Sequence, residues 1–361
     1  MSPLPAAAQP LSARSGRGGR FGLVAAGLGL FSLVSVFWAC LLGALAIPAG
    51  QVLAILLQAA GLHGAAAVPE GASVAVLDLR LARACLAWLV GCGLGAAGAA
   101  FQGLLRNPLA DSFTLGVSGG AAFGATLAIS LGLGAAEMLP ALGVLPLAGL
   151  CGAGLALCAV IGLAKAGGGL RRESLVLAGI VVATFLSALI SLVKALDEES
   201  VASIVFWIMR SLQGRGWPHV VLYLPWFCLG LTLLFCLGRE LDILCLGETQ
   251  ARQLGLHTGR SRLLVLTGAG LLTGAAVAVS GVIGFVGLVV PHLCRMLQGA
   301  EHRPLLLSSG LLGGALLLWA DVLARTILPG GAELPAGVVT ALVGGPFFCL
   351  LLRRRLIREA R

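Results

Sequence analysis

Long apolar runs, separated by short polar segments, constrain this chain more than any other feature of its sequence. The first run, Phe21 to Ile47, contains no charged residue. Of all 361 residues, 58% are hydrophobic and 11% are charged, whereas about 25% are charged in a typical soluble domain. A helix needs about 20 apolar residues to cross a bilayer. The sequence therefore predicts an all-α integral membrane protein.

The spacing of these runs predicts a single transmembrane domain over residues 21–355, with about ten membrane-spanning helices. Two short tails flank this domain: a basic segment, 1–20, which we expect to be disordered, and residues 356–361. The 53 glycines are spread through the apolar runs, which is typical of membrane helices that pack closely through small residues. The expected spans are 21–47, 84–104, 113–134, 140–164, 174–193, 219–238, 263–281, an eighth after residue 281, 305–325 and 336–352.

The arginines indicate how the chain crosses the membrane. They precede the first span and follow the last, so the positive-inside rule places both termini in the cytoplasm and requires an even number of spans. The net charge of +9 does not indicate nucleic-acid binding, because no lysine-rich patch accompanies it. We expect a multi-pass protein of the cell (inner) membrane, surrounded by lipid. The terminal arginines are Arg14, Arg17, Arg20, Arg353, Arg354, Arg355, Arg358 and Arg361.

The sequence has no recognisable catalytic motif. It lacks a phosphate-binding loop, an HExxH zinc motif and a nucleophile elbow, and its ten cysteines form no CxxC pair. We therefore expect no catalytic residue, no metal site and no cofactor held by this chain. Energy for transport would come from a partner ATPase or from an ion gradient. An ion-coupled secondary transporter is the alternative, and Asp321 is its one candidate for a carboxylate within the membrane.

The longest polar interruption between two apolar runs is Arg239–Arg262. Its middle, Thr249 to Leu254, lacks Gly and Pro and predicts a short helix that Gly255 ends. Short helices on a loop of a membrane protein suggest a docking surface for a soluble partner, although a solvated loop is the simpler interpretation.

Three further arginines and one turn are candidates for function. Arg80 and Arg83 lie outside by the predicted topology, against the positive-inside bias; they would either bind carboxylates of an external protein or anchor the chain at the membrane interface. Arg325 lies one helical turn beyond Asp321, so the two could form an ion pair within one helix. Asn107 belongs to a polar turn with Pro108, which ordinary turn chemistry also explains.

The order of these segments resembles that of ABC importer permeases for iron-siderophores, haem and vitamin B12. The resemblance rests on LGETQARQLGL in the polar interruption, GVIGFVGLVVPHLCR after residue 280, and ELPAGVVTALVGGPFFCLLL near the end. Arg80-Leu81-Ala82-Arg83 is similar to the family's RLPR motif, with Ala82 in place of proline. The NPLAxP-like turn ends in Ser112, again in place of proline. The similarity extends over most of residues 77–355.

The resemblance implies the fold of a type II importer permease that works as a homodimer, and it assigns roles to particular residues. Two copies of an ABC ATPase subunit, which would bind ATP and Mg²⁺, would grip residues Gly247, Glu248, Ala251, Arg252, Leu254 and Gly255. A periplasmic or lipid-anchored substrate-binding protein would dock on Arg80, Arg83 and Arg325. Asn107 and Leu109 would form the cytoplasmic gate. An iron(III)-siderophore is the first expected cargo, and vitamin B12 and haem are the others.

Overall fold

A bundle of helices makes up nearly all of the computed structural model, which describes residues 12–43, 45–62, 69–133, 137–139, 142–167, 169–209, 212–329 and 332–359. The strands in these ranges are two short antiparallel ones, β1 (Glu137–Leu139) and β2 (Leu142–Gly143). The helices are α1 (Ser12–Leu41), α2 (Ala49–Ala59), α3 (Glu70–Val74), the π-helix η1 (Ala75–Leu81), α4 (Ala82–Leu105), α5 (Val117–Ser130), α6 (Val144–Ala166), α7 (Arg172–Leu196), α8 (Val201–Met209), α9 (Trp217–Cys236), α10 (Gly238–Leu246), α11 (Glu248–Gln253), α12 (Thr258–Ser280), α13 (Val286–Gln298), α14 (His302–Thr326) and α15 (Ala336–Glu359).

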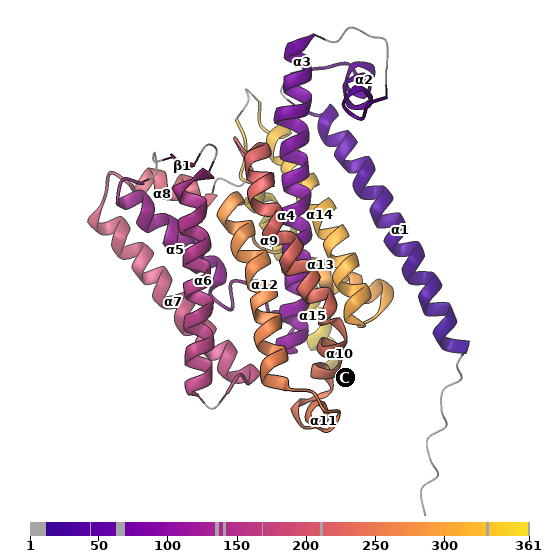
Figure 1. Ribbon diagram of the computed structural model, residues 1–361, viewed down its shortest axis with the longest axis vertical. Helices are drawn as coiled ribbons and strands as arrows, with labels where there is room; N and C mark the ends of the chain where they lie inside the picture. Colours follow the sequence, from indigo (N-terminus) through magenta and orange to yellow (C-terminus); the bar gives the residue numbers. More distant parts are fainter. Residues whose placement is uncertain are drawn as a thin grey trace, which may run out of the picture.

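Seven helices in the described ranges are long and apolar enough to cross a membrane: Phe21–Leu41, Glu70–Leu105, Val144–Ala166, Arg172–Leu196, Trp217–Cys236, Thr258–Ser280 and His302–Thr326. The shorter helices α5 and α13, together with α15, complete the bundle, so the prediction of an all-α membrane protein with about ten helices is confirmed. α10 and α11 lie at one end of the bundle, here called the α11 end, and α2, α8 and β1 lie at the opposite end (Figure 1). α1 begins and α15 ends on the α11 side, as an even number of spans requires.

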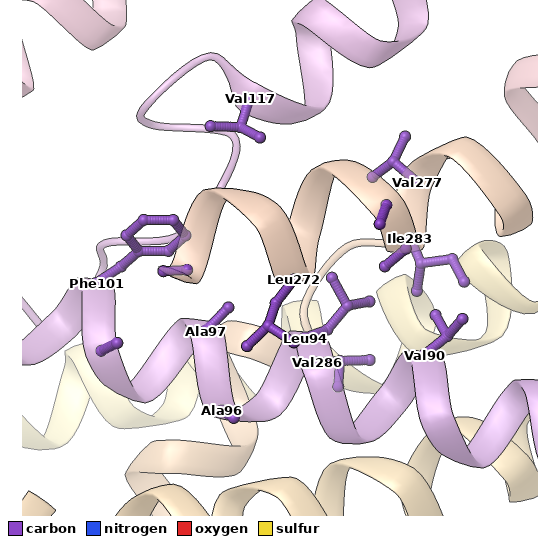
Figure 2. Packing of buried hydrophobic residues seen from close by; sticks show 14 of the residues in the cluster. Val90, Leu94, Ala96, Ala97, Phe101, Val117, Leu272, Val277, Ile283 and Val286 are labelled. Carbon is purple, nitrogen blue, oxygen red and sulfur yellow. The ribbon is translucent and has the colours of Figure 1, made fainter. Parts of the chain in front are cut away.

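α4 is the centre of the bundle. Its side chains are buried against α9, α12, α13 and α14, and Figure 2 shows Val90, Leu94 and Phe101 spaced along α4 in one cluster with Leu272 of α12. Since lipid is as apolar as these side chains, close van der Waals packing, rather than exclusion of water, holds such helices together.

Small residues allow α4 and α14 to approach closely. A Cβ atom on Gly91 would lie 2.3 Å from the carbonyl oxygen of Gly313, and one on Gly95 would lie 2.2 Å from that of Ser309. Because real Cβ atoms are not found at such distances, only glycine fits at these two points of the crossing. The glycine-rich sequence thus sets the distance between the two helices.

Several helices begin or end away from the predicted boundaries. α1 begins at Ser12, inside the tail expected to be disordered, and ends at Leu41 rather than Ile47. The second span begins at Glu70 rather than near residue 84, because α3, η1 and α4 form one continuous helix. α12 begins at Thr258 rather than 263. Hydropathy marks where lipid surrounds a helix, whereas a helix continues into polar residues for as long as its backbone hydrogen bonds are satisfied.

Two stretches that the sequence assigned to spans are not helical. Residues 112–116 form turns, so α5 begins at Val117 instead of near Phe113. Residues 281–285 separate α12 from α13, with Gly281 and Phe285 at positive φ angles of 72° and 67°. Ile283 in this break is buried against the core (Figure 2). Irregular backbone at membrane depth is tolerated where protein, not lipid, surrounds it.

Candidate functional site

The polar interruption forms a compact projection at the α11 end, made of α10 and α11. Gly247, between the two helices, has a φ angle of 129°, and Gly255, just after α11, has one of 81°; both lie in the region that favours glycine. The predicted short helix with Gly255 as its stop is therefore confirmed. Ala251 is fully buried, while Leu254 is 62% exposed.

Glu248 fixes α11 to the start of α12. One of its carboxylate oxygens lies 2.5 Å from Nη2 of Arg252, one turn later in α11, and the other lies 3.3 Å from Nη1 of Arg262. Arg262 also donates a hydrogen bond of 2.6 Å to the carbonyl of Leu170, between α6 and α7. The projection is thus held in place by ion pairs and does not behave as an independent loop.

Arg106 joins this projection to the polar turn after α4. Its Nε and Nη2 atoms donate to the carbonyl oxygen of Leu244 in α10, at 3.2 and 2.6 Å, and its guanidinium lies beside Gly247. Arg106 itself adopts a left-handed conformation with φ 48°, which is unfavourable for a residue with a side chain. No local sequence pattern indicates this contact, because 138 residues separate its two ends.

The predicted gate residues lie directly after Arg106. Asn107 accepts a hydrogen bond of 3.0 Å from the backbone N–H of Leu109, which is an Asx turn, so ordinary turn chemistry accounts for Asn107. Leu109 is 43% exposed. Asp111 stabilises the next turn by accepting hydrogen bonds from the N–H groups of Phe113 and Thr114. Burial raises the pKa of Asp111, and these two hydrogen bonds oppose that rise.

The three arginines predicted to dock a binding protein lie near the other end of the bundle, where Arg80 and Arg83 are buried and Arg325 is half-buried. Arg83 forms ion pairs with Asp321 (Nη2 to Oδ1, 2.8 Å) and with Glu333 (Nη2 to Oε2, 2.9 Å). Asp321 has no exposed surface, and Arg325 lies 3.9 Å from it, so the predicted pair within α14 is secondary to the bond from α4.

Arg80 and Arg325 are held by backbone carbonyls at the end of α1. Arg80 donates to the carbonyl of Cys40 at 2.9 Å, to that of Leu41 at 3.3 Å, and to that of Leu45. Arg325 donates to the carbonyl of Ala39 at 2.7 Å. These arginines therefore connect α1 with η1 and α14 in this conformation, and their docking role stays a prediction.

One further polar contact was not foreseen. Oδ1 of Asp242, in α10, accepts hydrogen bonds from the backbone N–H of His302 at 2.9 Å and lies 2.7 Å from its Nδ1 atom. The pair links the projection to the first residue of α14. Among the described residues, no group of three His, Cys, Asp or Glu side chains could hold a metal ion.

A multi-helix bundle with a polar projection tied to a turn at the end of its central helix is the architecture of a multi-pass membrane protein. The chain belongs to the FecCD transport family, which matches residues 30–354. Its relatives are permease subunits of ABC transporters, and an ABC importer implies ATPase and substrate-binding partners.

Individual proteins support this assignment. The chain is 46% identical to the ABC transporter permease protein YvrB of Bacillus subtilis (strain 168), over 78% of this chain and 79% of that protein. It is 40% identical to the cobalamin import system permease protein BtuC of Halobacterium salinarum, over 81% and 76%, and 40% identical to the hemin transport system permease protein HmuU of Yersinia pestis, over 79% and 84%. A solved metal-chelate type ABC transporter in an inward-facing conformation superposes with a TM-score of 0.79 at 31% identity, covering 92% of this chain and 99% of that one.

Proposed function

We propose that this chain is the transmembrane permease subunit of an ATP-driven importer that carries a metal chelate, with an iron(III)-siderophore as the first expectation. Vitamin B12 and haem are the other candidates. Relatives of equal identity are named for cobalamin and for hemin, so similarity supports the class of cargo rather than one member of it. An external substrate-binding protein would select the chelate and deliver it.

In this proposal the α11 end faces the cytoplasm, where two copies of a separate ATPase subunit bind α10 and α11. ATP and Mg²⁺ bind to those subunits, and this chain hydrolyses nothing. The observation that carries the proposal is the contact from Arg106 to Leu244. Through this contact, a movement of the projection would reach Asn107 and Leu109 at the gate and switch the passage between outward and inward access.

The passage itself would form between two copies of this chain. The face of α7 supports this arrangement, because it presents a row of exposed apolar side chains that lipid or a second copy must cover. The exposed large apolar residues of α7 are Leu177, Ile180, Val181, Phe185, Leu192 and Leu196.

The environment of Asp321 weighs against an ion-coupled secondary transporter. A coupling carboxylate has to exchange its ion with water during the cycle. Asp321 instead has no exposed surface and is paired with Arg83. An importer driven by a partner ATPase needs no such exchange.

Co-purification of the tagged full-length chain from its native membrane tests the proposal. A P-loop ATPase is expected in equal amount. Leu254→Arg should remove the ATPase, because this exposed residue at the tip of the projection makes none of the ion pairs that hold α11. Glu248→Arg should also uncouple ATP hydrolysis from uptake, but it breaks the pairs with Arg252 and Arg262 as well.

Leu62→Arg is the matched control, since Leu62 is 61% exposed and follows α2 at the opposite end of the bundle. This variant should retain the ATPase. A chain that purifies without an ATPase and still transports under an ion gradient would refute the importer and support the carrier.

A further inference from the structure

A cavity of about 1040 Å³ opens at the α11 end, at the boundary where three of the candidate spans begin or end. Its walls come from the last turn of α4, from α10, from the end of α13 and from the start of α14. This is the depth at which the headgroups of a surrounding bilayer lie. Arg106 and Asn107, beside the proposed gate, also line it.

The charge of the cavity is strongly positive. Four arginines line it, namely Arg106, Arg239, Arg295 and Arg303, against the two carboxylates of Asp242 and Glu301. The side chains of Arg239 and Arg295 form no ion pair or hydrogen bond with any other part of the chain that the structure describes. Asp242 does not neutralise them, because its Oδ1 atom is occupied by His302. Arginines without counterions in one cavity attract an anion.

The residues of the cavity favour a phosphate group over other anions and over cations. Guanidinium groups bind phosphate oxygens through paired, charge-assisted hydrogen bonds, and α14, a helix of 25 residues, begins at the cavity wall with His302 and Arg303. The positive end of its dipole adds to the attraction. A metal ion would meet four positive charges here.

The rim of the cavity indicates where the phosphate comes from. Arg303 lies over the ring of Phe235, 5.9 Å from its centroid, and Phe235 is 44% exposed in the last turn of the span formed by α9. An arginine of the cavity thus lies against a lipid-facing side chain. Basic pockets between membrane helices on the cytoplasmic side are typical sites for anionic lipid headgroups.

We propose that this cavity binds the phosphate group of an anionic phospholipid, held by Arg239, Arg295 and Arg303, with the acyl chains along the exposed face of α9 beside Phe235. Bound there, the lipid contacts both α10 of the projection and the first turn of α14. The cavity borders the proposed gate at Arg106 and Asn107, but the three arginines that hold the phosphate are not among the residues predicted to bind the ATPase, so failure of the site would leave the proposed function untouched.

Native mass spectrometry of the full-length chain in phosphatidylcholine micelles, titrated with phosphatidylglycerol, tests this site. The wild-type chain should retain phosphatidylglycerol in preference to phosphatidylcholine. Arg239→Gln with Arg303→Gln should weaken this binding at least about tenfold, since each loses a charge-assisted contact. Arg171→Gln with Arg172→Gln removes the same charge from exposed arginines outside the cavity and should leave binding unchanged.

Competition with inorganic phosphate at millimolar concentration tests whether the ligand is a lipid headgroup or free phosphate. If phosphate displaces the lipid and raises the melting temperature with the same dependence on Arg239 and Arg303, the ligand is free phosphate and the lipid source is wrong. If both double variants lost phosphatidylglycerol binding equally, or if the wild-type chain showed no preference for phosphatidylglycerol, the proposed site would be wrong. If the double variant unfolds, Arg239→Gln alone decides, because this exposed side chain makes no contact that the fold needs.

Discussion

Arg83, in α4, is the main counterion of Asp321, which is buried in α14. It bonds Asp321 and Glu333, both far away in the sequence. Arg83→Gln leaves the buried Asp321 with only its longer contact to Arg325, and loss of one partner of a buried ion pair costs about 3–5 kcal/mol. We expect a large fall in the melting temperature of the purified protein. Arg172→Gln, in an exposed pair with Glu173, should change it little.

Adding Asp321→Asn to Arg83→Gln separates the structural role of Arg83 from docking. The double variant should recover part of the stability, because the buried Asp321 no longer carries a charge that has lost its main partner. If the stable double variant still fails to bind the substrate-binding protein, Arg83 also contributes to docking. Unchanged stability in Arg83→Gln alone would contradict the ion pair.

Arg106 gives the sharpest test of how the gate is moved. Arg106→Ala and Arg106→Gly both lose the bonds to Leu244, so both should lower uptake per ATP hydrolysed, by about tenfold if one charge-assisted hydrogen bond is lost. They should differ in stability, because glycine accepts the left-handed backbone at this position and alanine is strained there by about 1 kcal/mol. Uptake and ATPase assays in proteoliposomes give the ratio.

If uptake followed stability, with Arg106→Gly close to wild type, the contact would be structural only.

Neither Arg106 nor Glu333 could be chosen from the sequence. The sequence marked Arg80 and Arg83 as unusual because of their charge in the predicted topology, but it could not supply their partners, which come from the end of α1 and from α14.

At the scale of elements, the crossing of α4 and α14 depends on the close approach of the two helix backbones. Gly95→Ala would place a methyl group 2.2 Å from the carbonyl oxygen of Ser309, so the helices must separate. Overpacking of this kind costs about 1–3 kcal/mol, which a lower melting temperature would reveal. Gly154→Ala is the control, because a Cβ atom there meets nothing within 4 Å; an equal fall in both variants would rule out the crossing as the cause.

The predicted helices were confirmed where apolar runs are long, and their boundaries were wrong where helix and apolar run do not coincide. Residues 112–116 and 281–285 have the composition of a span but are not helical. Hydropathy cannot distinguish a buried turn from a helix, since both are surrounded by apolar side chains. The π-helical η1, just before Arg83, is equally invisible in the composition.

At the scale of the whole molecule, the proposal makes the α11 end cytoplasmic. A protease site inserted between Leu254 and Gly255 should resist cleavage in sealed right-side-out vesicles and be cut once they are permeabilised. A site inserted between Glu198 and Glu199, just before α8, should be cut at once. Cleavage products are separated on a gel. The reverse pattern would show that the α11 end faces outward, and the assignment of the ATPase surface would then be wrong.

The sequence by itself determined that lipid surrounds this protein, that about ten of its helices belong to the membrane bundle, and that a polar projection lies at Arg239–Arg262. Each of these follows from local composition: apolar runs of sufficient length, glycines within them, and a polar stretch between two of them. The predicted roles of particular residues depended on the resemblance to a family.

Only the tertiary structure decided which charges meet. It buried Arg80 and Arg83, tied Arg106 to the projection and brought four arginines to one cavity. The physical reason is distance along the chain. Ion pairs in a helix bundle form between segments that packing brings together, and that packing is set by the shape of whole helix faces, which no local pattern encodes.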